Sequence, residues 1–420
     1  MNLAKNKTRK RVWLWLSICV NLGFLGVFKY FNFFAESLAD ALSDLGLQVN
    51  IWSLQVILPV GISFYTFHGL SYIIDVYRNK VKPERNFIDY ALFVSFFPLL
   101  VAGPIERATH LLPQIKKERK FDHVKAVDGL RQILWGLFKK MVIADNCAQY
   151  ANAIFNNPAD FSGSTLVLGA VFFAIQIYCD FSGYSDIALG TARLLGIDLF
   201  QNFAFPYFSR SIAEFWRRWH ISLSSWFKDY VYIPLGGSRG SAFKKIRNIF
   251  IIFLVSGFWH GANWTFIAWG FLHALYMMPA VLFGTNRNNL DTAATGRLFP
   301  TIKELLQMAI TFSLVVFAWI FFRATDLHQA FNFIWGIFSR SLFQMPDIQL
   351  ITGLQIQPYM LVVFLMMFLF IEWIGRMQQY ALAGFALQWP KPLRLTFYYC
   401  LAMIIFLFGG KEQQFIYFQF

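Results

Sequence analysis

Apolar segments long enough to cross a lipid bilayer recur along this 420-residue chain. A membrane helix needs about 20 mainly apolar residues, because the hydrocarbon layer is about 30 Å thick and each helical residue adds about 1.5 Å. Such a pattern predicts an all-α, polytopic transmembrane helical bundle. Apolar helices are expected near residues 12–34, 49–74, 164–180, 183–198, 247–283, 303–322, 327–343, 351–374 and 392–409.

The composition supports a membrane setting. With 57% hydrophobic and 14% charged residues, the chain has too little polar surface to cover a soluble globule of its size. The net charge of +14 comes from basic residues in short loops between apolar segments, as is typical of cytoplasmic loops. We therefore expect the lipid bilayer as a partner and no nucleic acid, because no base-stacking motif accompanies the charge. The four cysteines are far apart and form neither a disulfide framework nor a metal-ligand spacing.

Loop charges and segment lengths also predict the topology. The apolar run at 12–34 is too long for a cleaved signal peptide and is expected to start from the cytoplasm. The acidic residues that follow, Glu36, Asp40 and Asp44, are expected in an external loop. The segment at 87–102 is short and lies between two basic loops, so we expect it to be re-entrant. The helix at about 128–155 carries Lys139 and Lys140 in its middle, which indicates an interfacial position.

One imidazole, His260, lies inside the apolar and aromatic run at 251–264. Ionisable groups within the membrane are costly, so a functional site is the default interpretation, and a packed core histidine is the alternative. Gly257 and Gly261 are four residues apart and would let a helix or an acyl thioester approach the backbone. Asn263 could orient the ring or bind a carbonyl oxygen.

The segment at 211–230 reads as one amphipathic helix. Arg217, His220 and Ser224 would share one face of it, and Glu214 would pair with Arg218 four residues later. Its cations are suited to phosphate, although an interfacial anchor with snorkelling arginines explains the same pattern. Farther upstream, three charged residues are expected to form structural ion pairs inside the bundle: Asp180, Asp186 and Arg193.

Two motifs are more specific. Trp-Arg-Arg-Trp-His-Ile-Ser-Leu-Ser-Ser-Trp-Phe-Lys-Asp-Tyr at 216–230 and Ser-Gly-Phe-Trp-His-Gly-Ala at 256–262 resemble the membrane-bound O-acyltransferase family, in its bacterial branch that acetylates alginate and peptidoglycan. Three further matches to that branch are Pro-Val-Gly-Ile-Ser-Phe-Tyr at 59–65, Ala-Gly-Pro-Ile-Glu-Arg at 102–107 and Cys-Asp-Phe-Ser-Gly-Tyr-Ser-Asp at 179–186. The resemblance covers nearly the whole chain.

The resemblance implies re-entrant and interfacial helices around a central tunnel. One membrane domain would span 1–420, with a catalytic core at about 57–280, C-terminal helices at 303–409 and an aromatic tail at 411–420. Members of this branch usually carry about two more hydrophobic segments before the position where this chain begins.

The family resemblance also implies residue roles. His260 would be the catalytic histidine and His220 its companion across the tunnel, because acyl transfer from a coenzyme A thioester to a hydroxyl needs a base and histidine is the usual one. The tunnel lining would include Trp259, Arg217, Ser224, Asp180, Asn263, Gly257 and Gly261. Arg239, Lys244 and Lys245 could meet the coenzyme A phosphates, although positive-inside topology explains them equally. No bound cofactor and no metal are expected; acetyl-CoA would be the donor substrate.

The chain stops on the aromatic sequence Phe-Ile-Tyr-Phe-Gln-Phe at 415–420. This tail resembles the C-terminal motif of small membrane partners in D-alanylation systems, where a tyrosine is thought to carry the acyl group. The resemblance implies that Tyr417 accepts acetyl with His260 as base and presents it to an extracytoplasmic, SGNH-hydrolase-like transferase. An aromatic interfacial anchor is the alternative.

The function expected from these residues is acetyl transfer from cytoplasmic acyl-CoA to a cell-envelope polysaccharide, by a multi-pass protein of the bacterial inner membrane. Pro-Leu-Gly-Gly at 234–237 favours the polysaccharide branch over D-alanine transfer to teichoic acid. A transporter and a non-catalytic subunit of a polysaccharide export machine remain alternatives, although a transporter should show an internal repeat.

Overall fold

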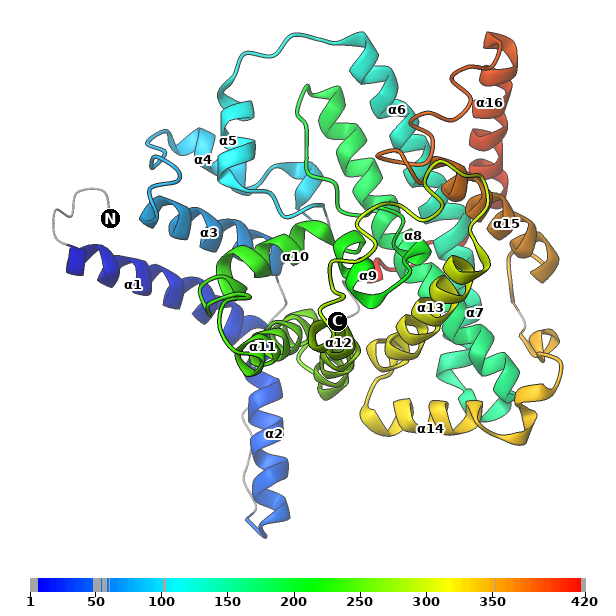
Figure 1. Cartoon of the computed structure of the whole chain (residues 1–420), viewed down its shortest axis with the longest axis horizontal. Helices are drawn as coiled ribbons and strands as arrows, with labels where there is room; N and C mark the ends of the chain where they lie inside the picture. The colour runs from blue at the N-terminus through cyan, green and yellow to red at the C-terminus, as the bar shows by residue number, and fades with distance from the viewer. Residues whose placement is uncertain are drawn as a thin grey trace.

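The computed structural model describes residues 7–47, 54, 59, 61–100, 103–351 and 353–416. All regular elements of this described part are helical (Figure 1), which confirms the all-α prediction. Six helical stretches are long and apolar enough to cross a membrane, as expected for a polytopic protein: Lys7–Asp44, Gly163–Leu194, Trp264–Leu282, Ile302–Arg323, Pro358–Gly375 and Lys391–Phe408.

The N-terminal stretch is a bent helix. Its parts are α1 (Lys7–Leu25), the π-helical turn η1 (Gly26–Tyr30) and α2 (Phe31–Asp44). The three acidic residues predicted in a loop lie in α2, which projects from the body of the protein (Figure 1), so that prediction was wrong. Acidic side chains on the helix surface leave the backbone hydrogen bonds intact. The helix ends only before Gly46, whose φ of 81° suits a C-terminal cap.

A long central helix, α8 (Gly163–Leu194), replaces the two helices predicted at 164–180 and 183–198. Beside it runs a continuous helical stretch composed of α6 (His123–Leu137), the π segment η3 (Phe138–Ala144) and α7 (Asp145–Asn156). The two stretches approach closely at paired glycines: a Cβ added to Gly183 would lie 2.8 Å from the carbonyl oxygen of Gly136. Small residues permit this contact between membrane helices.

The polar residues of α8 do not break it because their charges are paired. Lys139 Nζ lies 2.6 Å from Asp186 Oδ2, and Lys140 Nζ lies 2.8 Å from Asp180 Oδ1. Arg193 pairs with Asp128, so the three predicted ion-pair residues are confirmed as such. Both lysines thus point toward α8, and an interfacial position of their helix stays a prediction.

The predicted re-entrant segment is broken into short pieces. They are α4 (Phe87–Val94) and the 3-10 turn η2 (Phe97–Leu99), each too short to span a bilayer. The next helix is α5 (Ala108–Lys116). The preceding helix is α3 (Ile62–Tyr77). Most of the predicted span before it, at 49–60, lies outside the described residues.

The predicted run at 247–283 is two helices, α11 (Ala242–His260) and α12 (Trp264–Leu282), separated at Gly261–Asn263. The C-terminal half adds α13 (Ile302–Arg323), α14 (Leu327–Ile337), α15 (Pro358–Gly375) and α16 (Lys391–Phe408). The remaining short elements are η4 (Pro158–Asp160), η5 (Pro206–Phe208), α9 (Ile212–Arg218), α10 (Ile221–Phe227), η6 (Lys228–Tyr232), η7 (Arg340–Phe343) and η8 (Ile348–Leu350).

The main hydrophobic core lies between α8, the stretch from α6 to α7, and α12 to α15. Its largest fully buried side chains are three tryptophans, Trp135, Trp269 and Trp319. Buried aromatic area of this kind contributes most to such a core. Two of these tryptophans, Trp269 and Trp319, stack on one another next to the candidate site, with ring centroids 5.7 Å apart.

Candidate histidine site

A break in the helix positions His220. The single helix predicted at 211–230 is divided into α9 and α10, and His220 between them has a left-handed φ of 44°. The backbone groups at the break pair with another segment instead: Ile221 N donates to Asn202 O at 2.9 Å, and Ala204 N donates to Arg218 O at 3.0 Å. The prediction that Arg217, His220 and Ser224 share one helical face was therefore wrong.

The His220 ring is buried and held by an amide. Its Nδ1 lies 2.9 Å from Asn202 Oδ1, and Ser222 Oγ donates to the same oxygen at 2.9 Å. Since Asn202 presents its carbonyl oxygen, Nδ1 is the nitrogen that carries the proton, and Nε2 is the acceptor. Ile105 N donates to Ser222 Oγ at 2.9 Å, which joins this arrangement to the motif at 102–107.

The 102–107 motif is itself fixed by Glu106. Its carboxylate lies 2.7 Å from His110 Nδ1 and accepts from Phe200 N, and its backbone N donates to His68 Nε2 at 3.2 Å. The hydrogen bond to Glu106 raises the pKa of His110 above its usual value. His68 thus has a structural partner in the 102–107 motif.

His260 ends α11 inside an aromatic enclosure. Its ring centroid lies 4.8 Å from that of Trp259, 5.2 Å from Trp269 and 5.1 Å from Phe322. The Trp259 ring is also 6.2 Å from the His220 ring. The fold therefore brings His220, from the break between α9 and α10, together with Trp259 and His260 at the end of α11 in one buried site.

Two further residues of this site, which were not predicted from the sequence, come from the N-terminal helix. Lys29 Nζ donates to the carbonyl oxygens of Trp259 and His260, each at 3.0 Å. Tyr30 OH donates to Phe258 O at 3.1 Å. The sequence gives one indication of this role, because Lys29 is a charged residue within the apolar run at 12–34.

The glycines next to His260 admit the neighbouring helix. A Cβ added to Gly257 would lie 2.2 Å from Phe266 O, and one added to Gly261 would lie 2.1 Å from the Phe266 ring. The predicted close approach of a helix is thus confirmed. Asn263 caps α12, since its Oδ1 accepts from Thr265 N, and its Nδ2 donates to Thr325 O at 2.7 Å.

Asp180 meets the end of the chain. Ile416 N donates to Asp180 Oδ2 at 2.9 Å, and the Ile416 side chain is fully buried. The neighbouring Phe415 ring lies 6.3 Å from Phe181, whose ring lies 4.7 Å from that of His220. The described part of the tail therefore runs into the core beside His220. Tyr417, the next residue, lies outside the described residues.

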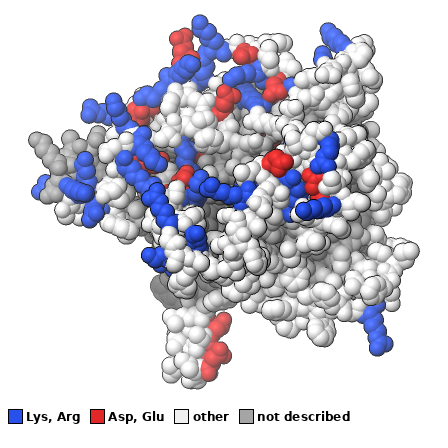
Figure 2. Space-filling view, viewed as in Figure 1, with Lys and Arg blue, Asp and Glu red and all other residues white. Residues whose placement is uncertain are grey.

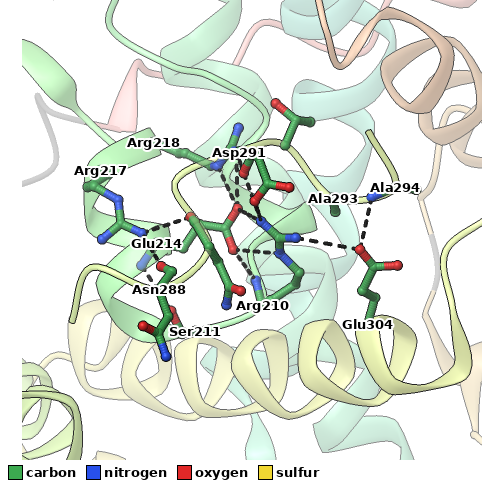
Figure 3. Close-up of polar contacts among 12 residues, drawn as sticks. Arg210, Ser211, Glu214, Arg217, Arg218, Asn288, Asp291, Ala293, Ala294 and Glu304 are labelled. Carbon is green, nitrogen blue, oxygen red and sulfur yellow. Dashed lines mark hydrogen bonds and ion pairs between the residues drawn. The ribbon is translucent and has the colours of Figure 1, made fainter. Parts of the chain in front are cut away.

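Arg217 belongs to a separate polar cluster (Figure 3). Its guanidinium donates to the carbonyl oxygens of Asn286, Asn288 and Asn289 at 2.8 to 3.1 Å. In the same cluster Glu214 binds Arg218 at 3.0 Å, which confirms the predicted pair. These contacts fasten the loop before α13 to α9. Ser224, on α10, donates to Trp219 O at 3.4 Å.

The predicted phosphate-binding residues lie at the far end of α11. Lys244 and Lys245 are in its first turn and Arg239 precedes it, about 24 Å along the axis from His260. Arg239 and Lys244 are exposed. Lys and Arg side chains are numerous on the face shown in Figure 2. Within the described residues, no group of three or more His, Cys, Asp or Glu could hold a metal ion.

The fold and the site together define a polytopic membrane protein with a buried two-histidine centre. Residues 14–322 match the model of the membrane-bound O-acyltransferase family, and the chain belongs to this family.

The relatives include polysaccharide-modifying proteins. "Probable alginate O-acetylase AlgI" of Pseudomonas aeruginosa is 42% identical over 82% of this chain and 64% of its own length. "Peptidoglycan O-acetyltransferase" of Helicobacter pylori is 37% identical over 78% of this chain and 65% of its own. "Teichoic acid D-alanyltransferase" of Bacillus subtilis is 29% identical over 64% of this chain and 70% of its own. The chain thus spans just under two thirds of the length of the first two.

Proposed function

We propose that this protein is an O-acyltransferase of the bacterial inner membrane. It would move an acyl group, most simply acetyl, from cytoplasmic acetyl-CoA toward a cell-envelope polysaccharide such as alginate or peptidoglycan. The observation that carries the proposal is the burial of His260 and His220 on either side of Trp259 in a member of this family. The higher identity to the two O-acetylating relatives favours acetyl over D-alanyl transfer.

In the proposed reaction His260 acts as general base. It takes the proton of the acceptor hydroxyl while the hydroxyl oxygen forms a bond to the thioester carbonyl carbon. The tetrahedral intermediate then collapses, the carbon–sulfur bond breaks, and the proton passes from His260 to the coenzyme A thiolate. His220, oriented by Asn202, would bind the reacting group from the other side. Arg239, Lys244 and Lys245 would attract the coenzyme A phosphates.

The proposed first acceptor is Tyr417. Support comes from the tail before it, which is anchored in the core by Asp180 and by Lys140, whose Nζ donates to Gln413 O at 3.3 Å. Acetyl-CoA and the tyrosine would give an acetyl ester and free coenzyme A. A serine of an extracytoplasmic, SGNH-hydrolase-like partner would then take the acetyl group from the ester and pass it to the polysaccharide.

Release of coenzyme A tests the catalytic assignment. The purified protein in lipid nanodiscs, together with its transferase partner and a polysaccharide acceptor, should release thiol from acetyl-CoA. His260→Ala should reduce the rate at least about 100-fold, the low end of what a general base contributes. His273→Gln is the control, because the His273 ring accepts a hydrogen bond from Trp216 and lies against Trp269, one ring beyond His260. Full activity of His260→Ala would contradict the assignment.

A further inference from the structure

We propose that Lys29 is a positioning residue whose positive charge serves the His260 site, in addition to its hydrogen bonds to the end of α11. The proposal rests on the acyltransferase function proposed above. Lys29 is a charged residue of the N-terminal helix. It takes part in no ion pair among the described residues, and the reaction proposed above gives it no role.

The geometry of the contact is unusual. The last four carbonyl groups of a helix have no partner within that helix, and in an apolar core such groups are costly to leave unpaired. Two neighbouring residues, Lys29 and Tyr30, bind three successive carbonyl oxygens of α11, those of Phe258, Trp259 and His260. Lys29 therefore lies at the backbone of the catalytic candidate itself.

Both residues lie in the last part of the π-helical turn η1. The helix changes direction at η1 (Figure 1), and single π turns in α-helices occur often at functional sites. The Tyr30 ring stacks on Phe258 with centroids 4.3 Å apart, which fixes the turn against α11.

A neutral donor would be enough to cap the helix, so the charge needs its own explanation. Among the described residues, no carboxylate lies within ion-pair distance of Lys29. By contrast, each of five other basic residues of the described bundle pairs with a carboxylate: Lys139, Lys140, Arg193, Arg210 and Arg218. When a hydroxyl attacks a thioester, negative charge develops on the carbonyl oxygen. A fixed cation in an apolar site stabilises that charge strongly, because no water screens it.

The same cation also favours the neutral, proton-accepting form of the nearby imidazole, because two positive charges repel each other. Lys29 would thus act in two ways on one step. It would keep His260 ready to accept a proton, and it would lower the energy of the oxyanion that forms as the proton moves.

Three substitutions separate the charge from the hydrogen bonds. Lys29→Gln keeps N–H donors without charge, Lys29→Arg keeps both, and Lys29→Met keeps neither. We expect Lys29→Gln and Lys29→Met to lower kcat for thiol release by about 100-fold with little change in KM, the low end of the effect of one oxyanion donor. Lys29→Arg should retain kcat to within about 10-fold. Thermal unfolding of each variant reports on the capping role.

Tyr30→Phe is the matched control. It removes the hydrogen bond to Phe258 O from the same turn without removing a charge, so it should lower the unfolding temperature and reduce kcat far less than Lys29→Gln does. A Lys29→Gln variant with wild-type kcat would overturn the proposal and leave Lys29 as a helix cap only. His260→Ala in the same assay distinguishes failure of the Lys29 proposal from failure of the proposed function. If His260→Ala stays active, the proposed function itself is wrong.

Discussion

At the residue scale, the orientation of the His220 ring depends on the polar side chains around it. Asn202 accepts from His220 Nδ1 and from Ser222, and its Nδ2 donates to Ser185 Oγ at 3.3 Å. An amide in this position selects one tautomer of the ring. The Ile105–Ser222 hydrogen bond extends the same support to the 102–107 motif.

We therefore expect Asn202→Leu to lower kcat by about 100-fold or more, since a histidine in the wrong tautomer costs up to about 10⁴-fold in hydrolases. Asn202→Asp retains an acceptor for Nδ1 and should keep much more activity than Asn202→Leu. Thiol release from acetyl-CoA is the measurement. Ser185→Ala is the control, because it removes only the outer partner of Asn202. Equal activities for the Leu and Asp variants would contradict a tautomer-fixing role.

At the element scale, the ends of helices carry the function and are the parts that the sequence predicts least well. Residues 302–323 and 391–408 are helices within one residue of the ranges predicted from apolar runs. The break at His220 was not predictable, because it depends on hydrogen bonds from 202–204, which are distant in sequence. The polar residues of α8 suggested a break in that helix, because the sequence does not show that they are paired. Their lysine partners lie in the preceding helical stretch.

The packing of α11 on α12 gives an element-scale prediction. Gly257→Ala places a methyl group against Phe266 O, so the helices must separate, and we expect a loss of about 1–3 kcal/mol in the free energy of unfolding. Gly23→Ala is the matched control, because nothing lies within 4 Å of its added Cβ. Denaturant unfolding in detergent measures both. Equal stability of the two variants would show that α11 and α12 do not pack as described.

The Glu106–His110 pair predicts a pH dependence. The pKa of His110 is raised in the folded protein, so its protonated form stabilises the fold below the unfolded value of about 6.5, and this contribution disappears as the pH rises through the folded pKa. The unfolding-temperature difference between wild type and His110→Gln should therefore shrink as the pH is raised from below about 6.5 through the folded pKa. A constant difference would mean that the pair does not titrate.

At the scale of the whole molecule, the N-terminal helix and the described part of the C-terminal tail both reach the histidine site. Lys29 and Tyr30 arrive from the N-terminal helix, and Phe415 and Ile416 arrive from the tail. Family motifs in the sequence identified His220 and His260 and the tail as the places to look. They did not identify Lys29 or Asn202, because a lone lysine in an apolar run and an asparagine in a loop acquire partners only after folding.

The anchoring of the tail can be tested separately. Asp180→Ala removes the acceptor of Ile416 N and leaves Lys140 with one carboxylate, Asp145, so the tail should leave the core more often. We expect faster removal of C-terminal residues by a carboxypeptidase than in wild type. Asp326→Ala is the control, because Asp326 caps α14 away from the tail. An unchanged rate would show that Asp180 does not hold the tail.

The central proposal is that Tyr417 accepts an acetyl group from acetyl-CoA with His260 as the general base. Intact-protein mass spectrometry after incubation with acetyl-CoA tests it most directly, with wild type, His260→Ala and Tyr417→Phe compared. We predict one acetyl adduct on wild type and none on either variant. An adduct that persists in Tyr417→Phe would contradict this prediction. So would wild-type protein that releases coenzyme A when an acceptor is added but never carries an acetyl group.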